Sequence, residues 1–459
     1  MRSPETAIPR RAPLAPLLRK ELWELLAGRA LWAMLLLVCP LIGYSYFQAV
    51  SLYGEASAAG QQSPVLATSL SPLDGIFVPT FGAAYVAVTL LFPFVAIRAL
   101  GHEKETGALR LLVQLPYRIS TLIGAKFAAV LAAWLIVSIP VLSSLVIWKL
   151  SGGHLSVAET SNLVAGHLLY GLLVGAIALF AAAISQSSAT AAILTLAFTI
   201  GSWVLDFTIA GQPGFLEWIA RLSLTQVLRP FEQGLLSVGV VVGVVAAICG
   251  FAALAGVWLP PGYSVRTKIV GSITCVVTVA LVVLIASRIG FGVDVTEDRR
   301  NSFSVADERA LASLTEPVVL TVHLAPEDPR YQDLRRNVLA KLQRVMSNVT
   351  IRLASGRQSF ARTGDDRYGE IEIAYGSRSD TTRSTSPREI LPMLYALADV
   401  EPPVQIPGGD YPGYPLIAYE RPALAWYFSG LPFLIIFAWW WSRRPPQTNK
   451  ARTAKETVL

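Results

Sequence analysis

The chain has 459 residues, of which 53% are hydrophobic and 15% are charged, whereas about 25% of the residues of a soluble domain are charged. This deficit excludes an ordinary soluble protein and indicates a membrane protein. The net charge of +7 does not indicate a nucleic-acid partner. The polar block 290–421 holds 16 basic and 19 acidic residues, or −3, and the remaining 22 basic and 12 acidic residues give +10. The apolar part therefore carries the basic excess, as cytoplasmic loops do.

Residues 1–30 are predicted to form a cytoplasmic tail that includes an amphipathic helix. Within Leu14–Leu26, the leucines lie near one helical face, and Arg19, Lys20 and Glu24 lie toward the other. This pattern is typical of a helix that lies along the inner leaflet before the first span. An N-terminal extension of the first membrane helix is the alternative.

Eight apolar runs of roughly 20 residues follow, each long enough to cross about 30 Å of hydrocarbon. The first six lie in residues 31–259 and are predicted to form one domain. A cytoplasmic loop and the seventh run occupy residues 260–289, and the eighth run occupies residues 423–441. The predicted fold is mainly α, a polytopic membrane helical bundle with about eight transmembrane helices. The predicted spans are Leu31–Val50, Val78–Ile97, Phe127–Ile147, Leu163–Ile184, Ala189–Phe207, Val238–Leu259, Ile269–Ser287 and Leu424–Trp441.

The placement of Lys and Arg predicts the orientation. Basic residues are frequent in the N-terminal tail, in the loop from Arg98 to Lys126, before the seventh span and in the tail 442–459, whereas Ser51–Phe77 has none. With eight spans, all the basic segments fall on one side of the membrane. We therefore place both termini in the cytoplasm, and the protein in the inner membrane of a bacterium.

The polar block, residues 290–422, is predicted to be a small extracytoplasmic α/β domain between the seventh and eighth spans. Strand and helix patterns alternate along it, which favours a sheet with helices packed on it. A stiff linker rich in Pro and Gly, Pro402–Pro415, leads back to the membrane. The predicted strands are Pro317–Leu324, Val349–Ala354 and Glu370–Tyr375, the helices are Pro329–Asn348 and Pro387–Leu397, and the predicted loop is Ser377–Ser386.

The charged segment His102–Lys126 links two spans on the predicted cytoplasmic side. Within it, Glu103–Leu115 can form a short helix across the membrane surface that ends at Pro116. The carboxylates of Glu103 and Glu105, with the leucines that follow, would supply charge and an apolar anchor for a groove on a soluble partner. From the residues alone, an ordinary cytoplasmic loop is the alternative.

This segment resembles the type-2 ABC permease family, in which acidic, basic and acidic residues precede Thr-Gly, Leu-x-x-Leu, Pro and a Lys that opens the next helix. The sequence Leu18–Leu22 and the six spans are also similar to that family. The resemblance implies a coupling helix seated on a separate ATPase, with Leu14–Leu26 as the connecting helix and Ser185–Ser188 as a second contact. The implied ATPase-coupling residues are Glu103, Lys104, Glu105, Thr106, Gly107, Leu109, Leu112 and Pro116, followed by Lys126.

The polar block is similar to the auxiliary component of gliding-motility-type ABC systems. In that family a span leads into D-x-T and S-x-S elements, a helix and a P-V strand, and the extracytoplasmic domain ends in a C-terminal span. This block is much shorter than the family's domain. The resemblance implies a permease fused to an auxiliary domain, whose motif residues are Asp294, Thr296, Ser302, Ser304 and Pro317.

Motifs for chemistry within this chain are missing from the sequence. Cys39, Cys249 and Cys275 all lie in apolar runs, and the histidines are scattered, so we expect no disulfide framework and no metal site. There is no P-loop, no G-x-S-x-G and no H-E-x-x-H, so we expect no cofactor and no enzyme activity. Among intramembrane ionisable residues, His167 and Asp206 stand out, and the sequence indicates no acid–histidine relay.

The predicted function is that of an ABC permease that couples ATP hydrolysis by a partner ATPase dimer to export or translocation of a substrate. ATP and Mg would bind in the ATPase. A second permease copy or a paired permease, membrane lipid and a periplasmic protein are the other expected partners. The first alternative is a mechanotransducer that acts on a periplasmic protein without moving a solute. The second is a membrane-bound enzyme with its active site in the polar block.

Overall fold

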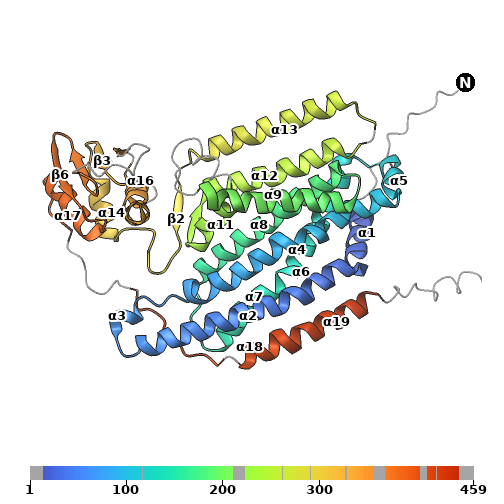
Figure 1. The fold of residues 1–459 in the computed structure, drawn as a ribbon, viewed down its shortest axis with the longest axis horizontal. Coiled ribbons are helices and arrows are strands. Elements are labelled where there is room, and N and C mark those ends of the chain that lie inside the picture. The colour runs from blue at the N-terminus through green and yellow to red at the C-terminus, as the bar shows by residue number, and fades with distance from the viewer. Residues whose placement is uncertain are drawn as a thin grey trace, which may run out of the picture.

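The structure is a computed structural model that describes residues 14–115, 117–209, 223–260, 262–289, 291–325, 328–346, 348–354, 367–403, 411–419 and 421–443. Figure 1 shows an elongated helical bundle with a small α/β domain at one end. The short helix α5 (Ala108–Gln114) lies at the opposite end. We call these the domain end and the α5 end. The predicted mainly α fold with a small α/β region is confirmed.

Eight segments of the described chain are long and apolar enough to cross a membrane, which confirms the predicted number. Each overlaps one predicted span. The longest, η1–α4, has 33 residues and is about 50 Å long, so it extends past a hydrocarbon layer of about 30 Å. The segments are α2 (Arg29–Gly60), η1 (Leu73–Phe77) with α4 (Val78–Glu105), α6 (Ile119–Val137) with α7 (Ile139–Leu150), α8 (Val157–Ile184), α9 (Ser188–Ile209), α12 (Val238–Trp258), α13 (Val265–Ala286), and α18 (Arg421–Ala425) with η3 (Trp426–Gly430) and α19 (Leu431–Ser442).

Helix α8 lies at the centre of the bundle, where 72% of its most apolar stretch of 18 residues is buried. It packs against α4, α6, α9 and α12, and against the short helix α11 (Leu224–Glu232). Small residues permit these close contacts, because a side chain at Gly171 would overlap the ring of Trp134. Helix α13 packs on α12, and 6% of its most apolar stretch of 18 residues is buried. It therefore lies at the edge of the bundle.

The N-terminal helix α1 (Leu14–Ala27) is separate from the first span. The backbone of Gly28 is extended, with φ −69° and ψ 152°, and α2 begins at the next residue. Leu17 is buried against Leu122 and Ala125 of α6. The leucine-rich face of α1 therefore packs on the bundle, and the chain does not enter the first span as one continuous helix. A second short connection, α3 (Pro64–Ala67), follows α2.

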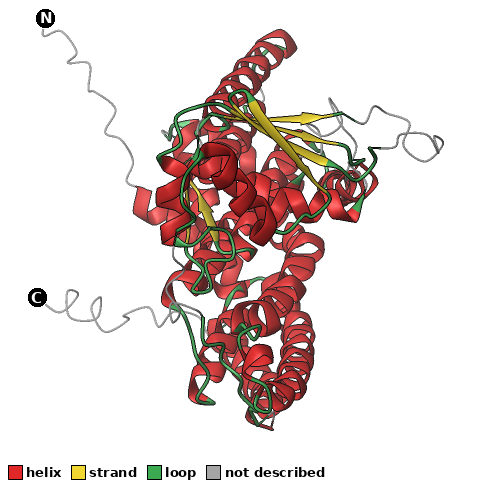
Figure 2. Cartoon of the chain, turned by 90° about the vertical axis from the view of Figure 1, so that its left-hand side faces the viewer, coloured by secondary structure: helices red, strands yellow, loops and turns green. Residues whose placement is uncertain are grey.

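The α/β domain is built on a four-stranded mixed sheet, shown in Figure 2. Its elements are α14 (Val305–Ala312), β3 (Val318–Val322), α15 (Pro329–Leu334), η2 (Arg335–Leu339), α16 (Ala340–Val345), β4 (Val349–Leu353), β5 (Ile371–Tyr375), β6 (Arg378–Thr382) and α17 (Pro387–Ala398). The strand order is β4-β3-β5-β6. Strand β3 is parallel to β4, and the other two pairings are antiparallel. A separate pair, β1 (Leu235–Ser237) with β2 (Gly292–Asp294), is antiparallel.

One face of this sheet forms the core of the domain. Leu320 and Ile373 point to that face and are fully buried, together with Leu342 of α16 and Leu394 of α17. Alternating buried and half-buried positions along β3 are what the β-branched sequence predicts for a strand covered on one face. The three predicted strands and both predicted helices of the block are present.

The predicted loop Ser377–Ser386 is wrong over its first half, because strand β6 occupies Arg378–Thr382. A tight turn at Gly376, with φ +58°, returns the chain antiparallel to β5. Strand β6 lies at the edge of the sheet, and its side chains are mostly exposed. An exposed edge strand carries polar residues on both faces, so the apolar alternation that identifies a half-buried strand is missing from its sequence.

Candidate functional site

The predicted single helix Glu103–Leu115 is wrong, because the Thr-Gly dipeptide separates two helices at the α5 end. Helix α4 ends at Glu105, and the Thr106 hydroxyl donates a hydrogen bond of 2.8 Å to the carbonyl oxygen of His102. Gly107 has φ +75°, in the left-handed region that glycine adopts without a Cβ penalty. Helix α5 begins at the next residue. Gly107 thus sets the angle at which α5 leaves α4.

Helix α5 has one face on the bundle and one face open. Leu109 is buried, and Leu112 is half-buried. The side chains of Leu111 and Leu115 are 68% and 46% exposed. Pro116, which the sequence predicts as the end of this helix, lies outside the described residues. The helix therefore presents an apolar surface at the α5 end while Leu109 anchors it.

Lys104 and Glu105 contact the turn between α8 and α9. The Lys104 ammonium donates hydrogen bonds to the carbonyl oxygens of Ala182 (2.8 Å), Ala183 (2.6 Å) and Ser185 (2.8 Å), at the end of α8. The Glu105 carboxylate accepts a hydrogen bond of 2.8 Å from the backbone N–H of Ser188, where α9 begins. A cation at a helix C-terminus and an anion at a helix N-terminus are both favourable. The two side chains therefore fix this turn to the end of α4.

Glu103 faces the interior of the bundle. Its Oε2 lies 2.5 Å from the Nζ of Lys126, and its Oε1 pairs with Lys20 of α1. Lys126 also lies 3.1 Å from an oxygen of Glu21. Glu103, Lys126 and Glu21 are all nearly inaccessible to solvent. We call Lys20, Glu21, Glu103 and Lys126 the charge cluster; it joins α1, α4 and α6.

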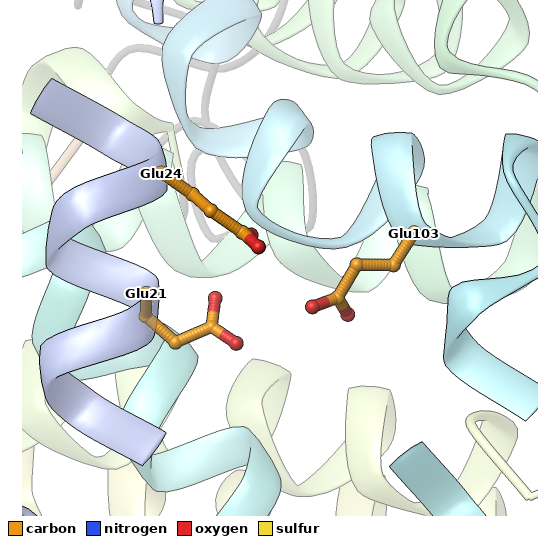
Figure 3. A group of neighbouring side chains, drawn as sticks. All are labelled: Glu21, Glu24 and Glu103. Atoms are coloured by element: carbon orange, nitrogen blue, oxygen red, sulfur yellow. The ribbon is translucent and has the colours of Figure 1, made fainter. Parts of the chain in front are cut away.

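Figure 3 shows that the carboxylates of Glu21, Glu24 and Glu103 converge, and their nearest oxygens lie within 4.8 Å of one another. Two ammonium groups pair with these three carboxylates: Lys20 lies 3.2 Å from Glu24, and Lys126 pairs with the other two. Burial raises the pKa of Glu21, and the ammonium of Lys126 opposes that rise. The lysines thus balance most of the negative charge, and the arrangement is an ion-pair network.

Sequence reasoning missed this network. Lys126 was expected to open a helix, but α6 begins at Ile119, so Lys126 lies inside it. The signal was a single Lys in the middle of a long apolar run, which requires an anionic partner. The partner on α1, Glu21, is separated from it by 105 residues. It could not be identified without the three-dimensional structure.

The predicted auxiliary-domain motif lies far from α5, at the domain end and beyond. Asp294 ends β2, and its carboxylate accepts a hydrogen bond of 2.6 Å from the hydroxyl of Thr296. Ser304 accepts a hydrogen bond of 3.0 Å from the backbone N–H of Asp307 and so caps α14. Pro317 immediately precedes β3. Ser302 lies between β2 and α14, and its backbone N–H donates a hydrogen bond to the carbonyl oxygen of Arg299.

Within the bundle, the structure brings an acid and a histidine together. The Nε2 atom of His167 on α8 lies 3.8 Å from a carboxylate oxygen of Glu232, the last residue of α11. His167 is buried, with its ring edge-on to Phe81. The sequence did not indicate this pair, because Glu232 falls in a loop between predicted spans. The side chain of Asp206 lies outside the described residues.

Comparison with known families places this geometry in context. A search of the curated proteins finds no match. A sequence model of the family described as "ABC-2 family transporter protein" matches residues 15–284, which is more than half of the chain. The matched region begins in α1 and ends in α13, and it includes α5 and the complete charge cluster. The chain therefore belongs to the ABC-2 transporter family.

Proposed function

We propose that this chain is the membrane-spanning permease of an ABC transporter and couples ATP hydrolysis by a separate ATPase dimer to the export or translocation of a substrate. Membership of the ABC-2 family supports a partnership with an ABC ATPase. The observation that carries the proposal is the exposed apolar surface of Leu111 in helix α5 and Leu115 just after it, on a segment that Leu109 anchors to the bundle. A helix can lay such an apolar face into a hydrophobic groove of a partner protein.

The contacts of the segment around α5 support a route for movement. Lys104 and Glu105 connect the end of α4 to the turn between α8 and α9. The charge cluster connects the same end of α4 to α1 and α6. A displacement of α5 would therefore reach α1, α4, α6, α8 and α9 together. In this proposal Glu103, Lys104 and Glu105 transmit the movement, and the leucines of α5 contact the ATPase.

The basic segments favour a cytoplasmic α5 end, with both termini on that side of a bacterial inner membrane. The α/β domain would then lie in the periplasm, as an auxiliary domain fused to the permease. ATP and Mg would bind in the ATPase. The substrate path would run between this bundle and a second copy or a paired permease. The alternative of a mechanotransducer acting on a periplasmic protein gains no support from the family match.

The test is co-purification of an ABC ATPase with the tagged full chain from native membranes. Leu111→Asp places a charge on the exposed face of α5, and we expect it to abolish co-purification while membrane insertion is retained. Leu150→Asp is the matched control, since Leu150 is 82% exposed at the domain end of α7. We expect the control to retain the ATPase. Full co-purification with Leu111→Asp would exclude α5 as the docking site.

A further inference from the structure

Residues 294–301, which we call the connector, link the seventh span to the α/β domain. They do not cross the gap as a free linker, because they are bound to three separate parts of the bundle and to the domain. We infer that the connector is a clamp that holds the domain ends of η1, α8 and α11 together and fastens them to the α/β domain. In the transport cycle, this clamp opens at its contact with the turn between α11 and β1.

The first contact is with the turn that joins α11 to β1. The backbone N–H of Val295 donates a hydrogen bond of 3.0 Å to the carbonyl oxygen of Gly234. The Asn301 amide donates one of 2.7 Å to the carbonyl oxygen of Gln233. Strand β2, which leads into the connector, pairs with β1 along its whole length. Thr296 packs so closely on Gly234 that a Cβ at position 234 would overlap the methyl group of Thr296.

The second and third contacts reach α8 and η1. The backbone N–H of Glu297 donates a hydrogen bond of 2.7 Å to the buried carboxylate of Glu159, in the first turn of α8. The Arg300 guanidinium pairs with Asp74 in the first turn of η1 and donates a hydrogen bond of 3.1 Å to the Ser71 hydroxyl. One short segment therefore bonds to three elements that are far apart in the sequence.

On its other side the connector is bound to the α/β domain. The Arg344 guanidinium of α16 donates a hydrogen bond to the carbonyl oxygen of Asn301. Lys341, one turn earlier, donates one of 3.1 Å to the carbonyl oxygen of Ser302. Phe303 then enters the hydrophobic core of the domain. Movement of the connector thus passes directly to α16.

The connector is internally braced. The Asp294 carboxylate accepts hydrogen bonds from the backbone N–H and hydroxyl of Thr296, at 3.1 and 2.6 Å, and from the backbone N–H of Asn301, at 3.0 Å. Burial acts to raise the pKa of Asp294, but hydrogen bonds from Thr296 and from the side chains of Ser302 and Asn301 outweigh it and hold the pKa below its usual value. The carboxylate therefore stays ionised and closes residues 294–301 into a compact loop, which can transmit force without first being extended.

The segment 411–419, which lies in the sequence between the α/β domain and the eighth span, meets the connector at Glu297. A carboxylate oxygen of Glu297 lies 2.8 Å from the Nε2 atom of His154, and the ring of His154 stacks on Tyr414 at a centroid separation of 3.5 Å. Tyr414 is itself held by α2, because the Tyr53 hydroxyl donates a hydrogen bond of 2.7 Å to its carbonyl oxygen. The connector and the segment 411–419 are therefore fixed to the bundle at one place.

A covalent lock tests the clamp, and this test rests on the proposed function. A Cβ at Gly234 would lie 3.5 Å from the Cβ of Thr296, within the range found in disulfides. We expect the complex of Gly234→Cys/Thr296→Cys with its ATPase to lose turnover by about tenfold when oxidised, and to recover it on reduction. The single variant Thr296→Cys is the control and should not respond to oxidation. Equal turnover in the oxidised and reduced double variant would overturn the inference.

A second measurement on the full chain alone needs no ATPase, so it separates failure of the clamp from failure of the proposed function. Arg300→Gln should raise hydrogen exchange by about tenfold in peptides that cover the first turn of α8 and the turn before β1. Arg383→Gln is the control, because it removes an exposed ion pair with Glu370 elsewhere in the domain. Unchanged exchange in Arg300→Gln would overturn the clamp, whereas absence of any co-purifying ATPase would overturn the proposed function.

Discussion

Replacing Lys126 by Met removes the central cation of the charge cluster and keeps an unbranched side chain. The Nζ atom of Lys126 lies 3.1 and 3.2 Å from the two carboxylate oxygens of Glu21 and 2.5 Å from Glu103. It also donates a hydrogen bond of 2.6 Å to the carbonyl oxygen of Ala99. The variant leaves two carboxylates buried beside each other, and Lys20 remains as their cation.

The expected loss in the free energy of unfolding is about 3–5 kcal/mol, which is the usual cost of removing one partner of a buried ion pair. The loss should depend on pH. Burial already raises the pKa of Glu21, and without the Lys126 ammonium that pKa rises further above its usual value of 4.5. Below about pH 4.5 Glu21 is protonated in the folded and the unfolded state, so its part of the penalty vanishes. As the pH rises toward the folded pKa, the penalty grows.

Chemical denaturation of the purified full chain in micelles, followed by tryptophan fluorescence at several pH values, measures this loss. The control is the neutral triple variant Glu21→Gln/Glu103→Gln/Lys126→Met, which leaves no buried charge without a partner. It should recover most of the stability that Lys126→Met loses, because neutral replacements of a whole ion-pair network are often tolerated. A loss below about 1 kcal/mol, or a triple variant no more stable than the single one, would refute the reasoning.

Two further predictions concern the angle of α5 and the α/β domain. Gly107→Ala forces φ +75° on a residue with a Cβ, and should lower the free energy of unfolding by about 1 kcal/mol in the same assay. Gly124 lies inside α6 with open space where a Cβ would be, so Gly124→Ala should not destabilise the protein. The Arg330 guanidinium, with the Tyr368 hydroxyl, holds the pKa of Asp328 at about 2. Asp328→Asn should therefore lower the melting temperature at pH 7, and the difference from wild type should vanish as the pH falls from 3.8 toward 2.

The spans could be predicted from the sequence because each one is a continuous apolar run, and hydrocarbon leaves the backbone few alternatives to a helix. The strands β3 and β5 could be predicted because one face of each is buried, which produces alternation. Strand β6 carries no such pattern because both of its faces are mostly exposed. The pair β1–β2 could not be predicted, since each strand has three residues and its partner lies more than 50 residues away.

The charged motif could be located from the sequence, but the directions of its side chains could not. Glu103 and Glu105 were expected to act together on one surface. Residues two apart on a helix lie about 200° apart around its axis, so they cannot share a face. In the structure Glu103 enters the charge cluster, and Glu105 accepts a hydrogen bond from Ser188. Helical geometry alone was enough to show that the two carboxylates could not face the same partner surface.

These different positions of the charged residues and the leucines decide how the proposed docking site has to be tested. A charge reversal at Glu103 would place a third cation beside Lys20 and Lys126 in a nearly inaccessible site, and the protein would lose folding before docking could be measured. A change at Leu111 alters the exposed face of α5 and leaves every ion pair in place. The acidic residues therefore fix the end of α4 to the rest of the bundle, and the exposed leucines beyond it are the surface on which the proposed partner would act.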